Sequence, residues 1–555
     1  MVPSIKPNRA TLVGIAGSNK AFSLSLYNLK AYVYREPLIR NSWDMNVIQH
    51  PLIGVTNRSE KVLLLAQKIA QTNPTLVGFS CYMWNLHAFH ELAVLLRKMV
   101  PEVLILWGGP EMTTDYVQAG KLDDYEMDFC VSGEGEATFL ELLLSLPYDE
   151  QRLLKIAGLS FRPQQKVPFK INEKRTPFKS LLEIPSPFLS GVVDDEVLFR
   201  PDIEANLETQ RGCTLRCSYC IYHKDMGKIS YSSAERTLNE ILFVLNKGVK
   251  RIRFVDANFS SELDHAKSVM RGLIQVKAET KLMFELIPGF IDEELAALFA
   301  EFNALHSWNE VTLGIGVQTI NYDILKKMRR GIKVERFEAT FALLEKYKIF
   351  AKIDLIIGLP GENIQSIERT LEYMIEKLRH SRAHLLCCHA MRGLPGTELI
   401  DIAKEHQMVF SSQNEPHELM ESPVLPRKEM VLCLRRTAVI FRLINHSGWA
   451  SREFISHEES FSTSIRDAFF AARQRLGVSN IGLIDLLIDG LMEHLRARNS
   501  WFVQENFPFA ETWWWSWSRV EIKDAWILKF LDSLGTGQQS NKAGATIPME
   551  SSLKG

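Results

Sequence analysis

The stretch "TQRGCTLRCSYCIYHK", residues 209–224, places Cys213, Cys217 and Cys220 close together in the chain. Three thiols cannot pair off as disulfides, and a closed tetrahedral zinc site needs a fourth ligand. His223 could be that ligand, so zinc remains one alternative. The other is an iron–sulfur cluster held by three thiolates, which leaves one iron open to a further ligand. We favour the cluster, because an open iron at a glycine-preceded loop is a position for chemistry.

The chain after this loop alternates short apolar runs with helical patterns. A first strand leads into "ETQRG", and a helix beginning at Ser232 is predicted after the loop, with Glu235 completing a capping box. The later strand–helix pairs are "RIRFVD" and 261–278, "LMFELI" and 291–302, "VTLGIGVQ" and 334–347, "AKIDLIIG" and 364–379, and "HLLCCHA" and a helix from about 396. Six such units predict a partial (β/α)6 barrel, which carries its chemistry at the carboxyl ends of its strands.

The first 150 residues show a second alternation of strands and helices. Apolar runs predict buried strands at 11–17, 76–82, 103–109 and 128–135, and helices are predicted at 59–71, with Ser59 as N-cap, and at 85–99. This pattern predicts a Rossmann-like parallel sheet covered on both faces. Several glycines fall at the strand ends, where such sheets bind ligands and where glycine lets the backbone approach them. Alternatively, these glycines only make tight turns.

The remaining segments complete the expected organisation of an α/β protein. A proline-punctuated stretch predicts a linker with a little strand, and the region after about 420 is mainly helical. The tryptophan block at 513–517 is interpreted as a hydrophobic seam between these helices and the barrel. The expected divisions are a front domain at 1–150, a linker at 151–199, the barrel at 200–415, helices at 416–535, and a disordered tail at 536–555.

The composition of the chain bears on its binding partners and on its cellular compartment. The chain of 555 residues has a net charge of -1, which gives no bulk electrostatic argument for nucleic acid or an anionic membrane. No apolar run of about twenty residues and no secretory signal are apparent. Eight cysteines, of which only three are clustered, favour a reducing compartment over a disulfide framework. We therefore expect a cytoplasmic protein without a membrane span.

The Cys-x3-Cys-x2-Cys spacing after the first strand of a partial barrel resembles the radical S-adenosylmethionine (SAM) enzymes. Tyr219 also fits, since that family usually has an aromatic residue just before the third cysteine. The resemblance implies a [4Fe-4S] cluster on Cys213, Cys217 and Cys220, whose open iron binds the amino and carboxylate groups of SAM. Reduction, by a donor such as flavodoxin or ferredoxin, then cleaves SAM to methionine and a 5′-deoxyadenosyl radical that abstracts hydrogen from a substrate.

Further segments resemble this family strand by strand. They are "FVDANF", "FELIPGFIDEELAALF", "GIGVQTIN", "IDLIIGLPGE" and "RGLPGTEL". The resemblance implies that Glu285 points into the barrel. The SAM-binding residues that it implies are Tyr219, Asp256, Asn258, Glu285, Gln318 and Asp354.

The front domain resembles the cobalamin-binding branch of the same family. The segments "VGFSCYMWN", "LWGGPE" and "VSGEGEATFLELL" look like the three strand ends of that branch. One departure is that no Asp-x-His-x-x-Gly motif occurs, and Ser23 stands near a place where relatives often carry a histidine. Either cobalamin is bound without a protein ligand to cobalt, or the domain no longer binds it; we favour bound cobalamin, because the glycine-lined strand ends remain. The cobalamin-binding residues that the resemblance implies are Ser80, Tyr82, Gly108, Gly109, Gly133 and Glu134.

The leading hypothesis is a cobalamin-dependent radical SAM methyltransferase that acts on an unactivated carbon of a small molecule or natural-product intermediate. The alternatives are oxidative cyclisation or rearrangement, and aminocarboxypropyl transfer from SAM, both without methyl transfer. A cobalamin- or cluster-based sensor would need a DNA-binding or signalling module, and the helical C-terminal region matches neither. We expect Cys387 and Cys388 in mid-strand to be core residues.

Overall fold

The computed structural model describes most of the chain. The tryptophan block at 513–517 and the tail at 536–555 lie outside the described residues, so the predictions for them are not tested. The described residues are 8–16, 20, 22–51, 58–165, 167–200, 203–224, 227–379, 381, 384–411, 417–444, 461–496 and 524–534.

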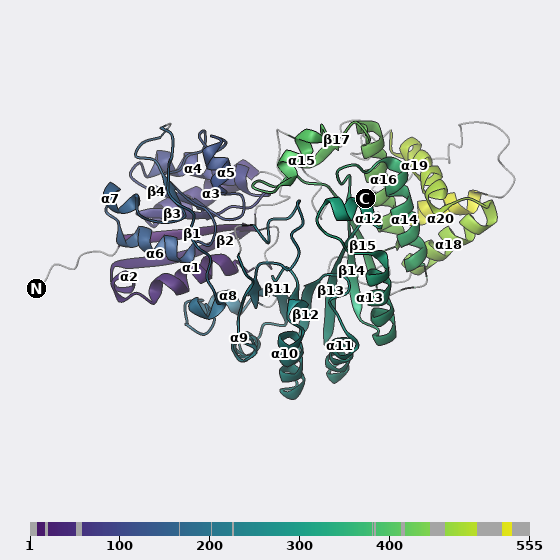
Figure 1. Cartoon of the computed structure of the whole chain (residues 1–555), viewed down its shortest axis with the longest axis horizontal. Helices are drawn as coiled ribbons and strands as arrows, with labels where there is room; N and C mark the ends of the chain where they lie inside the picture. The colour runs from purple at the N-terminus through teal and green to yellow at the C-terminus, as the bar shows by residue number, and fades with distance from the viewer. Residues whose placement is uncertain are drawn as a thin grey trace, which may run out of the picture.

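A seven-stranded sheet, here called the front sheet, forms the N-terminal part of the molecule (Figure 1). Its order is β2-β1-β3-β4-β5-β6-β7; the first five strands are parallel, and β6 and β7 are antiparallel additions. The predicted parallel sheet is confirmed, and the edge strand β2 was not expected. The strands are β1 Asn8–Ala16, β2 Trp43–Pro51, β3 Leu76–Ser80, β4 Leu104–Gly108, β5 Phe129–Val131, β6 Leu159–Phe161 and β7 Lys170–Ile171.

Helices cover both faces of the front sheet because alternate strand residues point to opposite sides. Val13 packs into the cluster that contains α3 and α4 residues, whereas Leu12 packs into the cluster with α1 and α6 residues. Helix α3 includes Arg58, so the expectation that Ser59 is its N-cap was wrong. The helices are α1 Leu24–Tyr34, α2 Pro37–Ser42, α3 Arg58–Gln71, α4 Leu86–Met99, α5 Thr114–Gln118, α6 Glu136–Leu144 and α7 Glu150–Leu153.

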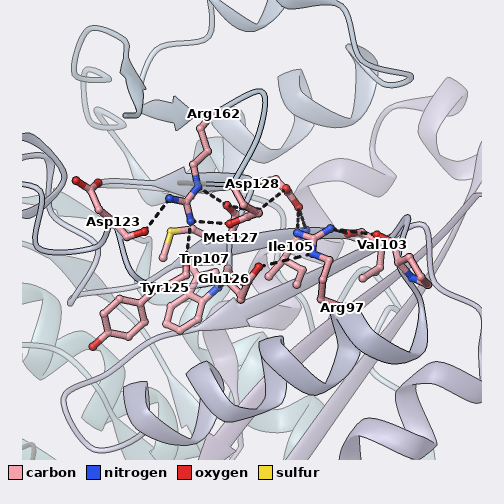
Figure 2. A network of polar contacts seen from close by, with 12 residues as sticks. Arg97, Val103, Ile105, Trp107, Asp123, Tyr125, Glu126, Met127, Asp128 and Arg162 are labelled. Carbon is pink, nitrogen blue, oxygen red and sulfur yellow. Dashed lines mark hydrogen bonds and ion pairs between the residues drawn. The ribbon is translucent and has the colours of Figure 1, made fainter. Parts of the chain in front are cut away.

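The segment expected as a linker begins as part of the front sheet. Arg162, which follows β6, is 2% exposed and donates from Nε to the carbonyl of Met127 and from Nη1 to that of Asp123, both at 2.9 Å. Nearby, Arg97 pairs with Asp128 at 2.8 Å (Figure 2). These contacts tie β6 to the loop before β5, so this arginine network stabilises the sheet. The segment also forms η1 Leu181–Glu183 and α8 Asp195–Leu198.

A six-stranded parallel sheet forms the predicted partial barrel, in the order β15-β14-β13-β12-β11-β8. The six strand–helix units are confirmed. The N-cap of α9 is Ser233, whose Oγ accepts from the Arg236 amide at 3.1 Å, so the start predicted at Ser232 was one residue too early. The strands are β8 Glu204–Leu207, β11 Arg251–Phe254, β12 Lys281–Leu286, β13 Glu310–Gln318, β14 Phe350–Ile357 and β15 His384–Ala390.

Helices pack on the outer face of the barrel sheet, where residues such as Ala205, Ile252 and Phe284 are almost fully buried. Two short antiparallel pairs, β9 with β10 and β16 with β17, were not predicted. The pairs are β9 Gln210–Arg211, β10 Ser230–Tyr231, β16 Val409–Phe410 and β17 Leu419–Glu421. The helices are α9 Ala234–Asn246, η2 Phe259–Ser261, α10 Leu263–Gln275, α11 Glu293–Leu305, α12 Tyr322–Lys327, α13 Val334–Tyr347, α14 Ile364–Leu378 and α15 Leu399–Glu405.

The C-terminal region is helical, as predicted, and packs beside α14 at the far end of the molecule from the front sheet (Figure 1). Arg436 joins it to the barrel by pairing with Glu368 of α14 at 2.7 Å, and it also pairs with Asp485 within the C-terminal region at 2.8 Å. No helix in the described parts of the chain is long and apolar enough to cross a bilayer. The helices are α16 Arg427–Ile444, α18 Phe461–Leu476, α19 Asn480–Arg496 and α20 Asp524–Ser533.

Candidate active site

The three clustered cysteines lie in a loop between the paired strands β9 and β10, at the carboxyl end of β8; residues 212–224 are here called the cluster loop. Gly212 opens the loop with a φ of +97°, a conformation that favours glycine. Cys217 is buried, while Cys213 and Cys220 are partly exposed. The loop therefore presents its thiols at the mouth of the barrel, as the sequence predicted.

The chemistry of these thiols fits an iron–sulfur cluster. Burial raises the pKa of Cys213, and it raises the pKa of Cys220 to about 11; in both cases neighbouring cysteines raise it further. The thiolates would thus repel one another unless a cationic centre binds between them. Among the described residues, no three His, Cys, Asp or Glu side chains, the three cysteines included, are grouped as a ready-made metal site, so this geometry does not separate zinc from a cluster.

Arg330 lies beside the cluster loop and was missed by the sequence analysis. Its Nη1 is 3.7 Å from the Sγ of Cys217, and its Nη2 donates to the carbonyl of Gly316. Arg330 is only 7% exposed, yet its Nε has no hydrogen-bond partner. Burial alone would lower the pKa of this guanidinium, but Tyr219 and the cysteines raise it. A buried, unpaired donor next to a cluster ligand is suited to an anionic ligand.

Two glycines of β13 make room for the predicted polar residues inside the barrel. Gly314 pairs with Glu285 of β12, and a Cβ on Gly314 would lie 2.7 Å from the Glu285 carboxyl carbon. A Cβ on Gly316 would lie 2.6 Å from Nε2 of Gln318 and 3.1 Å from Nη2 of Arg330. Glu285 and Gln318 therefore point into the barrel, which was expected of Glu285.

Gln318 ends β13 in a left-handed backbone conformation, with a φ of +70°, where the pairing with β14 is shifted. This conformation is uncommon for residues other than glycine, and it often occurs where a side chain is aimed at a ligand. The shift turns the Gln318 amide back over Gly316 and towards Arg330.

Asp354 lies in a charged cluster on the inner face of β14 and β15. Its carboxylate pairs with Nζ of Lys352 at 3.2 Å and with Nε2 of His389 at 3.1 Å. Burial opposes ionisation, but Lys352 and His389 keep the pKa of Asp354 below its ordinary value. Burial raises the pKa of Cys387, which faces Asp354 in the register, to about 12. Lys352 and His389 were not anticipated, and together these groups give the barrel a polar interior.

Two residues predicted to bind SAM use their polar side-chain atoms in hydrogen bonds to the loops at the barrel mouth. The Asp256 carboxylate accepts from the amide and hydroxyl of Thr209, at 2.7 and 2.6 Å, and from the Gln210 amide at 3.0 Å. Asn258 is fully buried, and its Oδ1 accepts from the Ile287 amide at 3.0 Å. Both side chains brace the strand ends that surround the cluster loop, and their contact with SAM stays a prediction.

Tyr219 is buried in the cluster loop between the second and third cysteines. Burial raises the pKa of its phenol, which keeps the side chain neutral. Its ring joins the main hydrophobic core together with Cys217. This packing holds the loop, and a contact with SAM stays a prediction.

The carboxyl edge of the front sheet carries the predicted cobalamin-binding residues other than Glu134. A Cβ on Gly133, which has a φ of +82°, would meet nothing within 4 Å, so the backbone there borders open space that a ligand can approach. Tyr82 stacks on Trp84 with a centroid separation of 4.6 Å, and Ser80 lies 3.3 Å from Ser25 through their hydroxyls. This open edge is compatible with a corrin ring.

The double glycine at the end of β4 has a different role at each position. A Cβ on Gly109, which has a φ of +115°, would lie 2.8 Å from the Cys81 amide nitrogen, so this glycine is required by a close approach of the protein's own backbone. A Cβ on Gly108 would make only ordinary contacts, the nearest at 3.7 Å. The tight turn of the protein's own backbone therefore explains Gly109 without a ligand.

Glu134 is turned away from this edge and towards the barrel. Its Oε1 accepts from Nη1 of Arg211 at 2.9 Å, and its Oε2 accepts from the Phe178 amide at 2.6 Å. The next acidic residue, Glu136, accepts from Nη2 of Arg211 at 2.7 Å. Arg211 lies in β9, two residues before Cys213, so at this point the front domain contacts the strand that leads into the cluster loop.

Known protein families match both candidate sites, the cluster loop of the barrel and the carboxyl edge of the front sheet. Residues 207–374 match the Radical SAM superfamily, and residues 45–143 match the B12 binding domain. The chain combines a radical SAM domain with a B12-binding domain. These matches assign a [4Fe-4S] cluster and SAM to the barrel and cobalamin to the front sheet, in agreement with the thiol set and the open edge at Gly133.

Two curated relatives are similar over part of this radical SAM protein. One is 2-(S-pantetheinyl)-carbapenam-3-carboxylate methyltransferase of Streptantibioticus cattleyicolor, 27% identical over 63% of this chain and 51% of the relative. The other is the cobalamin-dependent radical SAM methyltransferase TokK of Streptomyces tokunonensis, 26% identical over the same shares of both chains. The chain thus spans about half the length of these relatives.

Solved structures share the fold of this radical SAM protein. The methyltransferase TsrM from Kitasatospora setae, with cobalamin and a [4Fe-4S] cluster bound, has a TM-score of 0.57 at 17% identity and covers 74% of this chain and 80% of its own. The enzyme OxsB, with aqua-cobalamin and SAM bound, has a TM-score of 0.62 at 15% identity and covers 95% of this chain and 78% of its own. The likeness to OxsB extends over the C-terminal helices.

Glu111, which follows the double glycine of β4, predicts a dependence of stability on pH. It is 3% exposed, its Oε2 has no hydrogen-bond partner, and burial raises its pKa from 4.5 to about 7. Between these values the folded protein keeps a proton that the unfolded chain releases, so this group's contribution to stability falls as the pH rises to about 7.

We expect Glu111→Gln to match the wild type near pH 4.5 and to be more stable than the wild type at about pH 8, because the amide does not ionise. Thermal unfolding of the cofactor-free protein at both pH values measures this. An equal difference between the two proteins at both pH values contradicts the prediction.

Proposed function

We propose that this protein is a cobalamin-dependent radical SAM methyltransferase that methylates an unactivated carbon of a small molecule. The observation that carries the proposal is the contact that Arg211, in the strand that leads into the cluster loop, makes with Glu134 and Glu136 of the front domain. A methyl donor and a radical generator act on one substrate only if they open on the same space, and this contact between the two domains supports such an arrangement. The relatives named as methyltransferases support the same reaction.

The chain's own residues have distinct roles in this proposal. Cys213, Cys217 and Cys220 hold the cluster, and Arg330 directs its unpaired Nε–H to the SAM carboxylate. Glu285 and Gln318 line the barrel beside it, where they bind the remaining polar groups of SAM. When bound, the cofactors supply a 5′-deoxyadenosyl radical and a transferable methyl group, while the protein orients the reactants and excludes water.

The substrate and the setting belong to the same proposal. A relative from Streptomyces wedmorensis is named cytidylyl-2-hydroxyethylphosphonate methyltransferase, so similar chains include enzymes of small molecules. All eight cysteines are free thiols, which fits a reducing compartment such as the cytoplasm. A flavodoxin or ferredoxin would deliver the electron that cleaves SAM.

Product analysis tests the reaction type. The reconstituted protein is incubated without oxygen with SAM, cobalamin and a reductant, and the methyltransferase predicts both 5′-deoxyadenosine and S-adenosylhomocysteine. 5′-Deoxyadenosine alone would indicate cyclisation or rearrangement, and methylthioadenosine would indicate aminocarboxypropyl transfer. The methyltransferase proposal fails if neither of its two products appears.

Replacing Arg330 tests the SAM site. We expect Arg330→Met to weaken SAM binding by about 10- to 100-fold, because a charge-assisted hydrogen bond is worth roughly 1.5–3 kcal/mol. The measurement is the SAM concentration needed to change the electron paramagnetic resonance (EPR) spectrum of the reduced cluster. Arg329→Met is the control, since Arg329 is exposed and pairs with Glu398 at 2.7 Å. Equal SAM binding by both variants contradicts the assigned role.

A further inference from the structure

Arg211 contacts three carboxylates that come from both halves of the molecule. It donates to Glu134 and Glu136 of the front domain, and its Nε lies 2.9 and 3.0 Å from the two carboxylate oxygens of Glu208. Glu208 follows β8 of the barrel, immediately before the β9 strand that carries Arg211. One guanidinium is therefore the centre of a network that spans the two cofactor domains.

This network is largely removed from solvent. The side chain of Arg211 is 11% exposed, and those of Glu134 and Glu136 are 4% and 6% exposed. The pKa of Arg211 is raised because its carboxylate partners outweigh the cost of burial. Loss of the guanidinium would leave buried carboxylates without a counter-ion, which is strongly unfavourable. Lysine has no planar fork and cannot donate to three carboxylates in these directions.

The two ends of the network lie next to the two cofactor sites. Glu134 follows Gly133, where the front sheet borders open space, and Glu136 is the first residue of α6. On the other side, only Gly212 separates Arg211 from Cys213. A third segment joins this contact, because the Phe178 amide donates to the second oxygen of Glu134. Other contacts also join the two domains, such as the Glu204 amide donating to the Lys20 carbonyl at 2.8 Å, and Arg211 joins the Gly133 end of the front sheet to the strand that leads into the cluster loop.

We propose that Arg211 is a positioning residue that fixes the distance between the cobalamin-binding edge of the front sheet and the cluster loop. The inference rests on the proposed function, in which both cofactors serve one substrate. Methyl transfer then requires the substrate radical to form within reach of the methyl group, and an error of about 1 Å in such a geometry can cost roughly a hundredfold in rate. Cleavage of SAM depends only on the cluster and the barrel, so it does not need the same distance.

The test compares Arg211→Met and Arg211→Lys with Arg236→Met. Arg236 makes a similar set of contacts, with Glu240 at 3.0 Å and with the carbonyls of Leu181 and Ile184, but it does not touch the cluster loop. Pulsed dipolar EPR between cob(II)alamin and the reduced cluster reports the distance. Amide hydrogen exchange of residues 132–136 in the cobalamin-free protein reports the contact independently of the cofactor.

We expect a narrow distance distribution in the wild type and in Arg236→Met, a broad one in Arg211→Met, and an intermediate one in Arg211→Lys. Amide hydrogen exchange at residues 132–136 should accelerate in Arg211→Met alone. The yield of methylated product per 5′-deoxyadenosine formed by Arg211→Met should fall by about a hundredfold. An unchanged distance distribution and unchanged exchange in Arg211→Met would overturn the inference. If the wild type binds no cobalamin, the proposed function fails, whereas the exchange experiment still decides whether Arg211 holds the loop.

Discussion

Replacement of any one of Cys213, Cys217 and Cys220 by alanine is expected to abolish SAM cleavage while the front sheet stays folded. The reason is that three thiolates are the minimum set for a cluster with one open iron, and no other cysteine lies in the cluster loop. The measurements are iron content and 5′-deoxyadenosine formation for activity, and cobalamin binding for the front sheet. We expect 5′-deoxyadenosine to fall below detection in all three variants.

Cys433→Ala is the matched control for these variants. Cys433 is fully buried in α16, so its loss removes packing without touching the cluster loop. This variant should be slightly less stable than the wild type and should keep its iron and its SAM cleavage. The assignment is wrong if one of the three loop variants retains SAM cleavage at the level of Cys433→Ala.

Gly314→Ala is expected to cause the second large effect, because the added methyl group occupies the space of the Glu285 side chain. The new Cβ would lie 2.7 Å from the Glu285 carboxyl carbon, so this carboxylate must leave its position inside the barrel. We expect a destabilisation of about 1 kcal/mol, because the displaced atoms are the end of a flexible side chain. We also expect SAM cleavage to fall by about a hundredfold, since a displaced group no longer meets its ligand.

A double-mutant cycle with Glu285→Ala separates the steric effect from other causes. In the Glu285→Ala background the methyl group has room, so Gly314→Ala should then cost little stability. Thermal unfolding of the four proteins measures the coupling, and SAM cleavage should be similarly low in both single variants. An equal cost of Gly314→Ala in both backgrounds would show that Glu285 is not the group displaced.

The sequence predicted the cluster loop and the barrel well, because both depend on local signals. Cysteine spacing is read directly, and each buried parallel strand is a short apolar run followed by an amphipathic helix. The edge strand β2 was missed because "WDMNVIQHP" alternates polar and apolar residues and pairs on one side only. The start of α9 was displaced because Ser232 and Ser233 are both good N-caps, and only the backbone decides between them.

The roles of individual polar residues were harder to predict, since they depend on contacts between distant segments. Arg329 and Arg330 are adjacent and chemically identical, yet one is exposed and the other lies against Cys217. Glu134 follows a glycine at a cobalamin-like strand end, but it faces Arg211, which lies 77 positions further along the chain. Asp256 was expected to face the cofactor, and its carboxylate is occupied by Thr209 and Gln210.

The most direct test of the account is the metal and cofactor content of the protein purified without oxygen. The account predicts about four irons with matching sulfide, together with one cobalamin per chain. It also predicts that adding SAM changes the EPR spectrum of the reduced cluster. Protein that binds zinc in place of iron, or that takes up no cobalamin after reconstitution, would contradict it.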